Sequence, residues 1–337
     1  MASRAPLLAV EDLRVQFWTG SGTVYAVNGI SFEVAAGETL GIVGESGCGK
    51  SVTALALLGL LPRAGRVKAG NARLEGRELL RLKDRELRRL RGRQIAMIFQ
   101  DPMTSLNPVL TIGRQLREPL ETHFGLSRKE ATARAAELID RVGIPSAQAR
   151  ISDYPHQFSG GMRQRAMIAM ALACEPKLLI ADEPTTALDV TIQAQILTLL
   201  RELVAEEDTA LILITHDLGV VAGMCERVNV MYAGMFMETG SAEQLFEHPR
   251  HPYTLGLLQS VPRLDAARRA KLQPIEGAPR NMLQPPSACP FQPRCRYEVE
   301  QSSQEVPQLR QIEPGHMVAC FNPVPVEEWQ RARAAVG

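Results

Sequence analysis

The stretch "GESGCGKS", residues 44–51, has the residue types and spacing needed to hold a polyphosphate. It fits the pattern G-x-x-x-x-G-K-[ST] at every fixed position, follows a short apolar segment and opens a segment typical of a helix. Glycines permit a tight loop whose backbone N–H groups can surround phosphate oxygens. Lys50 can reach the β- and γ-phosphates, and the Ser51 hydroxyl can bind Mg²⁺. The loop residues expected to bind the nucleotide phosphates are Gly44, Glu45, Ser46, Gly47, Cys48, Gly49, Lys50 and Ser51, with Cys48 acting as a small filler.

Two carboxylates end a second apolar segment, "LLIADEP" at 178–184. If this segment is a strand of a parallel sheet, Asp182 would lie beside the phosphate loop at the carboxyl edge of that sheet. We expect Asp182 to be a partner of Mg²⁺. Glu183 would turn toward the γ-phosphate, where a carboxylate can orient or deprotonate water.

Gln100 and His216 close two further segments, "IAMIFQ" and "LILITH". Either residue by itself is more often a satisfied polar residue at a strand end. Together with the phosphate loop they are expected to face the same cavity, with Gln100 bridging to Mg²⁺ or water and His216 hydrogen-bonding the γ-phosphate. The expected Mg²⁺ ligands are Ser51, Gln100 and Asp182.

A second segment expected to bind an anion is "FSGGMRQR" at 158–165. Ser159 can cap a helix, while Gly160 and Gly161 let a ligand approach the backbone. A helix N-terminus of this kind is an anion site. The sequence therefore predicts two helix N-termini that can bind phosphate, at 44–51 and at 158–165.

Positioning these residues requires an α/β framework. Strands are expected at 7–17, 24–34, 39–44, 72–76, 95–100, 177–182 and 210–217. The first two alternate like antiparallel strands, and the last two are short and apolar, as in parallel sheets. Residues 101–177 look mainly helical, including an amphipathic helix at 128–143, and "TIQAQILTLLRELVAEE" at 191–207 has helical spacing. This order predicts a parallel-sheet core with an antiparallel β subdomain and a helical insert.

The composition of the 337-residue chain indicates its domain boundaries and the partners to expect. Near residue 250 the chain becomes rich in proline, which predicts one domain at 7–250, with its helical subdomain at about 101–177, and a small C-terminal extension at 251–337. A net charge of +1 gives no global signal for nucleic acid, and the basic run at 81–94 is interpreted as a solvated helix face.

No segment predicts a membrane span, because the longest apolar candidate, 52–62, is too short. The N-terminus lacks the apolar region and cleavage site of a signal peptide, so an intracellular location is expected. In that compartment the six cysteines are expected to be thiols or metal ligands. Cys174 and Cys225 lie in apolar surroundings and are expected in the core.

The order of these motifs resembles that of ABC-type ATPases over residues 7 to about 250. "FSGGMRQR" is the discriminating element, although Met162 stands where many members carry glutamine, and Asp189 of "ALD" matches the family's D-loop. The resemblance implies ATP hydrolysis by two ATPase domains packed head to tail. Each ATP then lies between the phosphate loop of one domain and the signature of the other, so Ser159, Gly160 and Gly161 would serve the partner's nucleotide. The family also stacks adenine on an aromatic residue of the N-terminal strands, for which Phe17, Trp18 and Tyr25 are candidates.

Four longer stretches resemble the ATPase subunits of dipeptide and oligopeptide importers and of related nickel and glutathione importers. They are residues 100–115, 154–172, 185–197 and 248–262. The resemblance implies two membrane-spanning permease subunits, an extracytoplasmic binding protein and a second ATPase chain, identical or homologous. It also implies a peripheral location on the cytoplasmic face of the inner membrane, with the helical insert contacting the permeases.

The C-terminal extension contains Cys289, Cys295 and Cys320. In this subfamily such a tail usually has four cysteines that hold an iron–sulfur cluster, and Ser302 corresponds to the third. A serine oxygen is a poorer ligand than a thiolate. Two alternatives stay open: a 4Fe–4S cluster on the three cysteines, or a tail folded around its prolines and apolar residues with free thiols.

Two other classes of function compete with a transport ATPase. A soluble ABC-type ATPase acting on DNA or ribosomes would usually carry two cassettes, a long coiled coil or zinc-finger modules, and the sequence shows none of these, so no nucleic-acid partner is expected. A P-loop kinase would have no use for "FSGGMRQR" or for Glu183 beside Asp182.

Overall fold

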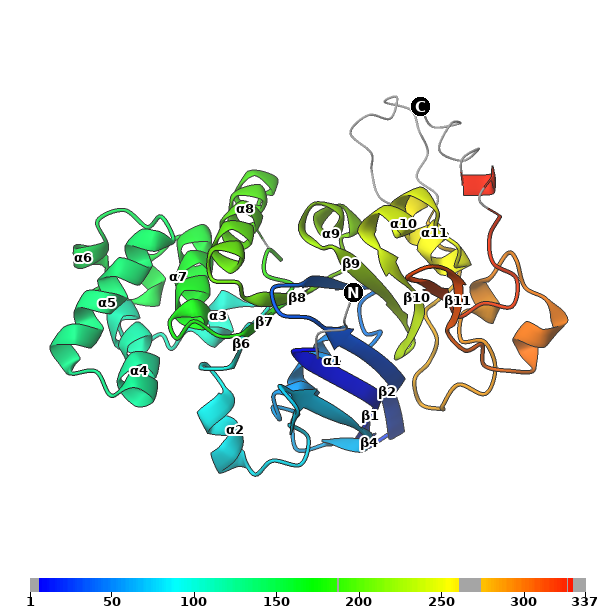
Figure 1. Ribbon diagram of the computed structural model, residues 1–337, viewed down its shortest axis with the longest axis horizontal. Coiled ribbons are helices and arrows are strands. Elements are labelled where there is room, and N and C mark those ends of the chain that lie inside the picture. The colour runs from blue at the N-terminus through cyan, green and yellow to red at the C-terminus, as the bar shows by residue number, and fades with distance from the viewer. Residues whose placement is uncertain (1–5, 187, 261–273, 326, 330–337) are drawn as a thin grey trace. The chain divides into compact units, whose positions relative to one another are not determined.

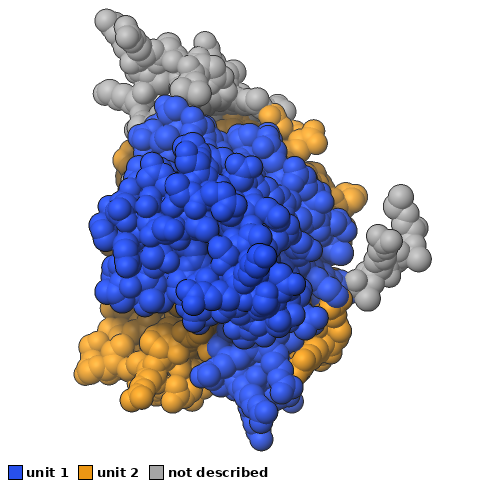
Figure 2. Space-filling model, turned by 90° about the vertical axis from the view of Figure 1, so that its left-hand side faces the viewer, with its two compact units in different colours: residues 1–7, 34–38, 81–213 blue, residues 8–33, 39–80, 214–337 orange. Residues whose placement is uncertain are grey.

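The computed structural model describes residues 6–186, 188–260, 274–325 and 327–329. Ala187 of the "ALD" stretch, residues 261–262 of the fourth resembling stretch and the last residues of the expected extension lie outside this part of the chain. The chain forms two compact units, coloured separately in Figure 2. Unit 1 comprises residues 1–7, 34–38 and 81–213, and unit 2 comprises residues 8–33, 39–80 and 214–337.

An antiparallel sheet in unit 2 has the strand order β2-β1-β4-β5. Its strands are β1 (Leu8–Thr19), β2 (Gly22–Val34), β4 (Gly65–Leu74) and β5 (Arg77–Glu78). Buried and exposed residues alternate along most of β1, as the sequence predicted for an antiparallel strand. One face of the sheet therefore packs on a core. The strand expected at 72–76 was placed wrongly. It begins at Gly65 and ends at Leu74, because Glu75 and Gly76 adopt φ of 48° and 79° and turn the chain into β5.

The phosphate loop of unit 2 lies between strand β3 (Thr39–Val43) and helix α1 (Lys50–Leu57). β3 pairs in parallel with β9 (Arg227–Tyr232), and β9 pairs antiparallel with β10 (Met235–Ser241). Four of the five residues of β3 are buried. The loop is therefore anchored by a buried strand on one side and by the first turn of a helix on the other.

The C-terminal segment continues this unit. Its elements are α9 (Leu218–Met224), α10 (Ala242–Glu247), α11 (Pro252–Ser260), η2 (Gln292–Arg294), η3 (Glu300–Ser303), β11 (Arg310–Glu313) and β12 (His316–Val318). β12 pairs antiparallel with β10, so the tail adds strands to the β9–β10 ribbon. Leu255 of α11 packs with Val324 and Trp329 in a buried cluster. Cys225, which follows α9, is buried as predicted.

Unit 1 combines parallel strands with a group of helices. β6 (Ile95–Ile98) pairs in parallel with β7 (Leu178–Asp182), and the sheet order continues from β7 to β8 (Ala210–Thr215). The helices are α2 (Asp84–Leu90), α3 (Pro102–Ser105), α4 (Ile112–Phe124), α5 (Arg128–Arg141), α6 (Ala147–Arg150), η1 (Pro155–Gln157), α7 (Gly160–Leu172) and α8 (Val190–Glu206). α4, α5 and α7 pack on one another (Figure 1). The helical character expected for 101–177 is confirmed.

Local sequence explains where these helices begin and end. Ser127 and Glu130 form a capping box at the start of α5, and Gly143, at φ 71°, follows its end. Of the basic run 81–94, only the α2 residues are helical, and Leu87 and Leu90 of α2 are buried. Cys174, just after α7, is buried as predicted. Among the described residues, no helix combines the length and apolar character needed to cross a membrane.

Candidate functional site: a phosphate loop, two carboxylates and a signature helix

The phosphate loop requires glycine at its two fixed positions. Gly44 and Gly49 adopt φ of 156° and 112°. A Cβ atom on Gly44 would lie 2.1 Å from the Met231 carbonyl oxygen, and one on Gly49 would lie 2.4 Å from the Ala26 carbonyl oxygen. Since backbone oxygens of β2 and β9 cannot move far, the loop tolerates no side chain at either position.

Lys50 is buried and folded back on the loop. Its Nζ donates hydrogen bonds to the carbonyl oxygens of Gly44 at 2.7 Å and Glu45 at 3.0 Å. A bound polyphosphate would offer charged oxygens in place of these carbonyls, and such bonds are about twice as strong as neutral ones. Cys48 lies beside the lysine and is buried; burial raises the pKa of its thiol, which favours the neutral side chain of a space-filling residue.

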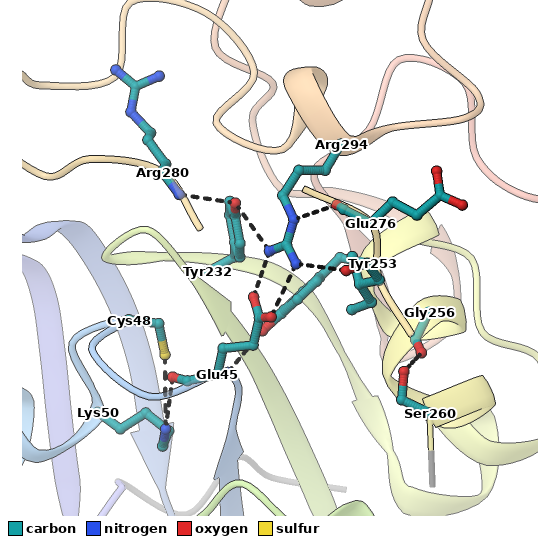
Figure 3. A network of polar contacts seen from close by, with 11 residues as sticks. Glu45, Cys48, Lys50, Tyr232, Tyr253, Gly256, Ser260, Glu276, Arg280 and Arg294 are labelled. Atoms are coloured by element: carbon teal, nitrogen blue, oxygen red, sulfur yellow. Dashed lines mark hydrogen bonds and ion pairs between the residues drawn. The ribbon is translucent and has the colours of Figure 1, made fainter. Parts of the chain in front are cut away.

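Two residues that the motifs did not predict also contact this loop. The Tyr253 hydroxyl accepts the backbone N–H of Glu45 at 2.8 Å. Arg294 forms a two-pronged ion pair with the Glu45 carboxylate, at 2.6 and 3.1 Å (Figure 3). Both come from the C-terminal segment. Tyr253 lies in the stretch 248–262, which the sequence analysis used only for its resemblance to importer ATPases. Nothing in that stretch indicated a contact with the phosphate loop.

In unit 1 the carboxylate of Glu183 is held in one orientation. Its Oε2 accepts hydrogen bonds from Gln100 Nε2 at 2.8 Å and from Thr186 Oγ1 at 2.9 Å. In both hydrogen bonds the partner donates and the carboxylate oxygen accepts. Glu183 also adopts φ of +46°, a left-handed conformation uncommon outside glycine and found at functional sites. The structure joins Gln100 and Glu183 through this hydrogen bond, and their place in a shared nucleotide cavity stays a prediction. Thr186, which the sequence analysis did not single out, lies in the "EPTT" turn.

The residues expected to hold Mg²⁺ have suitable chemistry. Asp182 ends β7 with only 5% of its surface exposed, and Ser51 is half-buried in the first turn of α1. Gln100 uses its amide nitrogen toward Glu183, so its amide oxygen is the atom that could bind a metal. Each of these side chains offers an oxygen atom, the donor type that Mg²⁺ prefers, and each stays a predicted ligand. His216 follows β8 directly and is exposed.

The signature residues open α7. Ser159 is the N-cap of this helix, and its Oγ accepts the Met162 N–H at 3.3 Å. Ser159 and Gly160 are exposed, so the helix end presents its N–H groups at the surface of unit 1. A Cβ on Gly161 would lie 2.9 Å from the Ile192 side chain of α8, and Asp189 caps α8 through the Ile192 N–H at 3.0 Å. The signature helix and the Asp189 turn thus meet at one residue, Ile192.

The three adenine-stacking candidates differ in environment. Phe17 is half-buried against Gly65, whereas Trp18 is 46% exposed with Lys68 Nζ 4.6 Å from its ring centroid. Tyr25 is half-buried and lines a cavity of about 490 Å³ in unit 2. Which aromatic side chain stacks on adenine stays a prediction.

The tail cysteines do not fit an iron–sulfur cluster of four thiolates. Ser302 stands at the position of the third of the four cysteines. Its Oγ accepts the Val299 N–H at 3.3 Å, and its carbonyl accepts the Cys289 N–H at 3.0 Å. Burial raises the pKa of all three thiols, to about 12 for Cys320. Across the part of the chain that the structure describes, no group of three or more His, Cys, Asp or Glu side chains is arranged to hold a metal ion.

Comparisons with known proteins agree with this geometry. Residues 27–186 match the family model for ABC transporters, and residues 237–301 match that for the oligopeptide/dipeptide transporter C-terminal region. The chain is 57% identical to the oligopeptide transport ATP-binding protein OppD of Salmonella typhimurium over 96% of this chain and 97% of that protein. It is 52% identical to the dipeptide transport ATP-binding protein DppD of Bacillus subtilis over 94% of each chain.

Solved structures place the fold in the same class. A dimeric structure of the ATP-binding cassette MJ0796 bound to ADP and Pi aligns with a TM-score of 0.63 at 27% identity, covering 70% of this chain and 98% of that one. The fold and the phosphate loop are therefore those of an ABC-type ATPase, which confirms the predicted fold. The sequence identity to OppD and DppD, which covers at least 94% of this chain, narrows the class further. This chain belongs to the family of oligopeptide and dipeptide transport ATP-binding proteins, as its motifs predicted.

Proposed function

We propose that this chain is the ATP-hydrolysing subunit of a peptide importer. The observation that carries hydrolysis is the Glu183 carboxylate, fixed by Gln100 and Thr186 directly after Asp182. Peptide as cargo is supported by relatives named for oligopeptide and dipeptide transport, whose similarity includes the C-terminal region.

In the proposed reaction the loop amides and Lys50 bind the β- and γ-phosphates of ATP. Ser51, Gln100 and Asp182 would hold Mg²⁺, which neutralises phosphate charge when bound. Glu183 accepts a proton from the attacking water as its oxygen bonds to the γ-phosphorus, and the bond to ADP breaks, leaving ADP and phosphate. His216 would hydrogen-bond the γ-phosphate.

We further propose that ATP joins two ATPase subunits head to tail. The N-terminus of α7 supports this role because Ser159 and Gly160 lie at the surface. Its hydrogen-bond donors are therefore accessible to the phosphates of an ATP bound by another subunit. A helix end contributes about 0.3–1 kcal/mol toward an anion, and each charged hydrogen bond about 1.5–3 kcal/mol. Losing the γ-phosphate would remove much of this link and let the pair open.

The proposal also places the chain at the cytoplasmic face of the inner membrane, bound peripherally to two permease subunits that work with an extracytoplasmic binding protein. Purifying the assembled transporter and identifying its bound cargo by mass spectrometry tests this part. Peptides are expected; nickel or glutathione in their place would contradict peptide import.

The catalytic assignment is tested with Glu183→Gln and Lys50→Ala in the assembled transporter. Glu183→Gln is expected to bind ATP normally but to hydrolyse it at least about a hundredfold more slowly, as loss of a general base does. Lys50→Ala is expected to lose ATP binding in a calorimetric titration. Glu202→Gln, an exposed carboxylate on α8, serves as the matched control with unchanged turnover. Normal turnover by Glu183→Gln would show that another group activates the water.

A further inference from the structure

Glu45 places a negative charge within the phosphate loop, next to Gly44. A carboxylate so close to a polyphosphate site opposes the binding of an anion, because like charges repel over short distances. The loop nevertheless keeps its other groups favourable to phosphate, including Lys50. Some group must therefore counter the Glu45 charge.

Arg294 is that group. Its side chain is only 4% exposed, whereas that of Glu45 is 27% exposed. Two guanidinium nitrogens bond the two carboxylate oxygens in parallel, at 2.6 and 3.1 Å, the fork geometry for which arginine is suited and lysine is not. The pair joins residues 249 positions apart in the sequence (Figure 3).

The remaining Arg294 contacts fix the guanidinium in place. Nε donates to the Glu276 carbonyl at 3.0 Å, and Nη2 also donates to the Ile275 carbonyl at 3.3 Å. Nη1 lies 3.4 Å from the Tyr232 hydroxyl at the end of β9. The arginine is thus held by backbone groups and a neighbouring strand independently of Glu45, so the tail presents a pre-positioned cation to the loop.

Glu45 is held at its other atoms as well. Its N–H donates to the Tyr253 hydroxyl, and its carbonyl accepts from Lys50. Among the described interactions of Glu45, only the hydrogen bonds from Arg294 involve its carboxylate oxygens. Removing Arg294 would leave that charge half-buried beside the phosphate site.

We propose that Arg294 of the C-terminal segment is a positioning residue for ATP binding, which acts by pairing with Glu45 and withdrawing its charge from the phosphate site. This inference depends on the proposed ATP-binding role of the loop. It gives the C-terminal segment a direct part in nucleotide affinity and assigns it no part in the chemical step.

The test is a double-mutant cycle measured by calorimetric titration of the full-length chain with MgATP. Arg294→Met is expected to weaken ATP binding roughly tenfold, equivalent to about 1.4 kcal/mol. In the Glu45→Gln background the same Arg294→Met change is expected to alter the affinity by less than about threefold, since no charge remains to be countered. Glu45→Gln alone is expected to bind ATP at least as tightly as the wild-type chain.

In the assembled transporter, Arg294→Met is expected to raise the KM for ATP while leaving kcat at saturating ATP within about twofold of wild type. Arg294→Lys, which keeps the charge and loses the fork, should recover part of the affinity. Near-ultraviolet circular dichroism, to which buried aromatic side chains such as Phe291 and Trp329 of the tail contribute, reports whether the tail is folded in each variant.

Three results would overturn the inference. Equal weakening by Arg294→Met in both backgrounds would mean that it acts through general packing of the tail. Unchanged affinity in a folded Arg294→Met chain would show that Glu45 needs no counter-charge. A lowered kcat with unchanged KM would place Arg294 in the chemical step. Failure of the proposed function is distinct: the wild-type chain would then bind ATP no better than Lys50→Ala.

Discussion

His251 makes a quantitative prediction about the stability of unit 2. It precedes α11 and is 1% exposed; its Nδ1 accepts the Tyr253 N–H at 3.0 Å, and its ring packs edge-on against Phe291. Burial lowers the pKa of this imidazole from 6.5 to about 4, and this outweighs the opposite effects of the nearby Glu238 carboxylate and a backbone hydrogen bond with Ala319. The native state thus holds His251 neutral over a range in which the unfolded chain protonates it.

The direction in which stability changes with pH follows from the difference in proton binding between the unfolded and native states. Between pH 4 and 6.5 the unfolded chain binds more protons at this position than the native chain, so stability is fully present above about pH 6.5 and falls as the pH drops toward 4. A pKa difference of roughly 2.5 units corresponds to about 3 kcal/mol. Most of that loss, about 2–3 kcal/mol, should occur between pH 7.5 and pH 4.5.

The assay is urea unfolding at these two pH values, followed by tryptophan fluorescence, to which the exposed Trp18 and the buried Trp329 both contribute. Trp329 packs with Leu255 of α11. The comparison is with His251→Asn, because asparagine can cap α11 and does not titrate. Wild type is expected to be more stable than His251→Asn at pH 7.5, and the difference should shrink by about 2–3 kcal/mol at pH 4.5. Titrating groups that do not interact with His251 cancel in this difference.

His156→Asn, a substitution at an exposed histidine, is the matched control and should show no such change. An equal stability difference between wild type and His251→Asn at both pH values would refute the reasoning, since the buried imidazole would then contribute no proton linkage.

Three further outcomes are expected. Gly49→Ala should lose ATP binding in a calorimetric titration, because its Cβ would meet the Ala26 carbonyl oxygen at 2.4 Å; normal affinity would show that the loop rearranges. Ser159→Ala should bind ATP normally as a single chain yet hydrolyse it at least about tenfold more slowly in the assembled transporter, and should destabilise α7 by about 1 kcal/mol in urea unfolding. Anaerobically purified protein should contain neither stoichiometric iron nor labile sulfide; finding both would mean that the three tail cysteines hold a cluster despite Ser302.

The sequence was sufficient for features that depend on neighbouring residues. The glycines and Lys50 of the phosphate loop have a fixed spacing, and the apolar runs that become β3, β7 and β8 are short and continuous. Capping residues such as Ser127 and Ser159 lie directly before their helices. Such patterns act within a few residues, so they predict where elements and the loop form. The bounds of β4 were missed because its end is set by the turn at Glu75 and Gly76.

Only the tertiary structure decided which side chains meet. The left-handed backbone of Glu183 and its bond with Thr186 depend on how the turn after β7 closes. The pairing of Glu45 with Arg294 depends on how the tail packs against the loop, because neither residue type determines a partner 249 positions away. Residue types and spacing therefore indicated the ATPase and its family, whereas packing decided which groups hydrogen-bond the Glu183 carboxylate and which cation pairs with Glu45 of the phosphate loop.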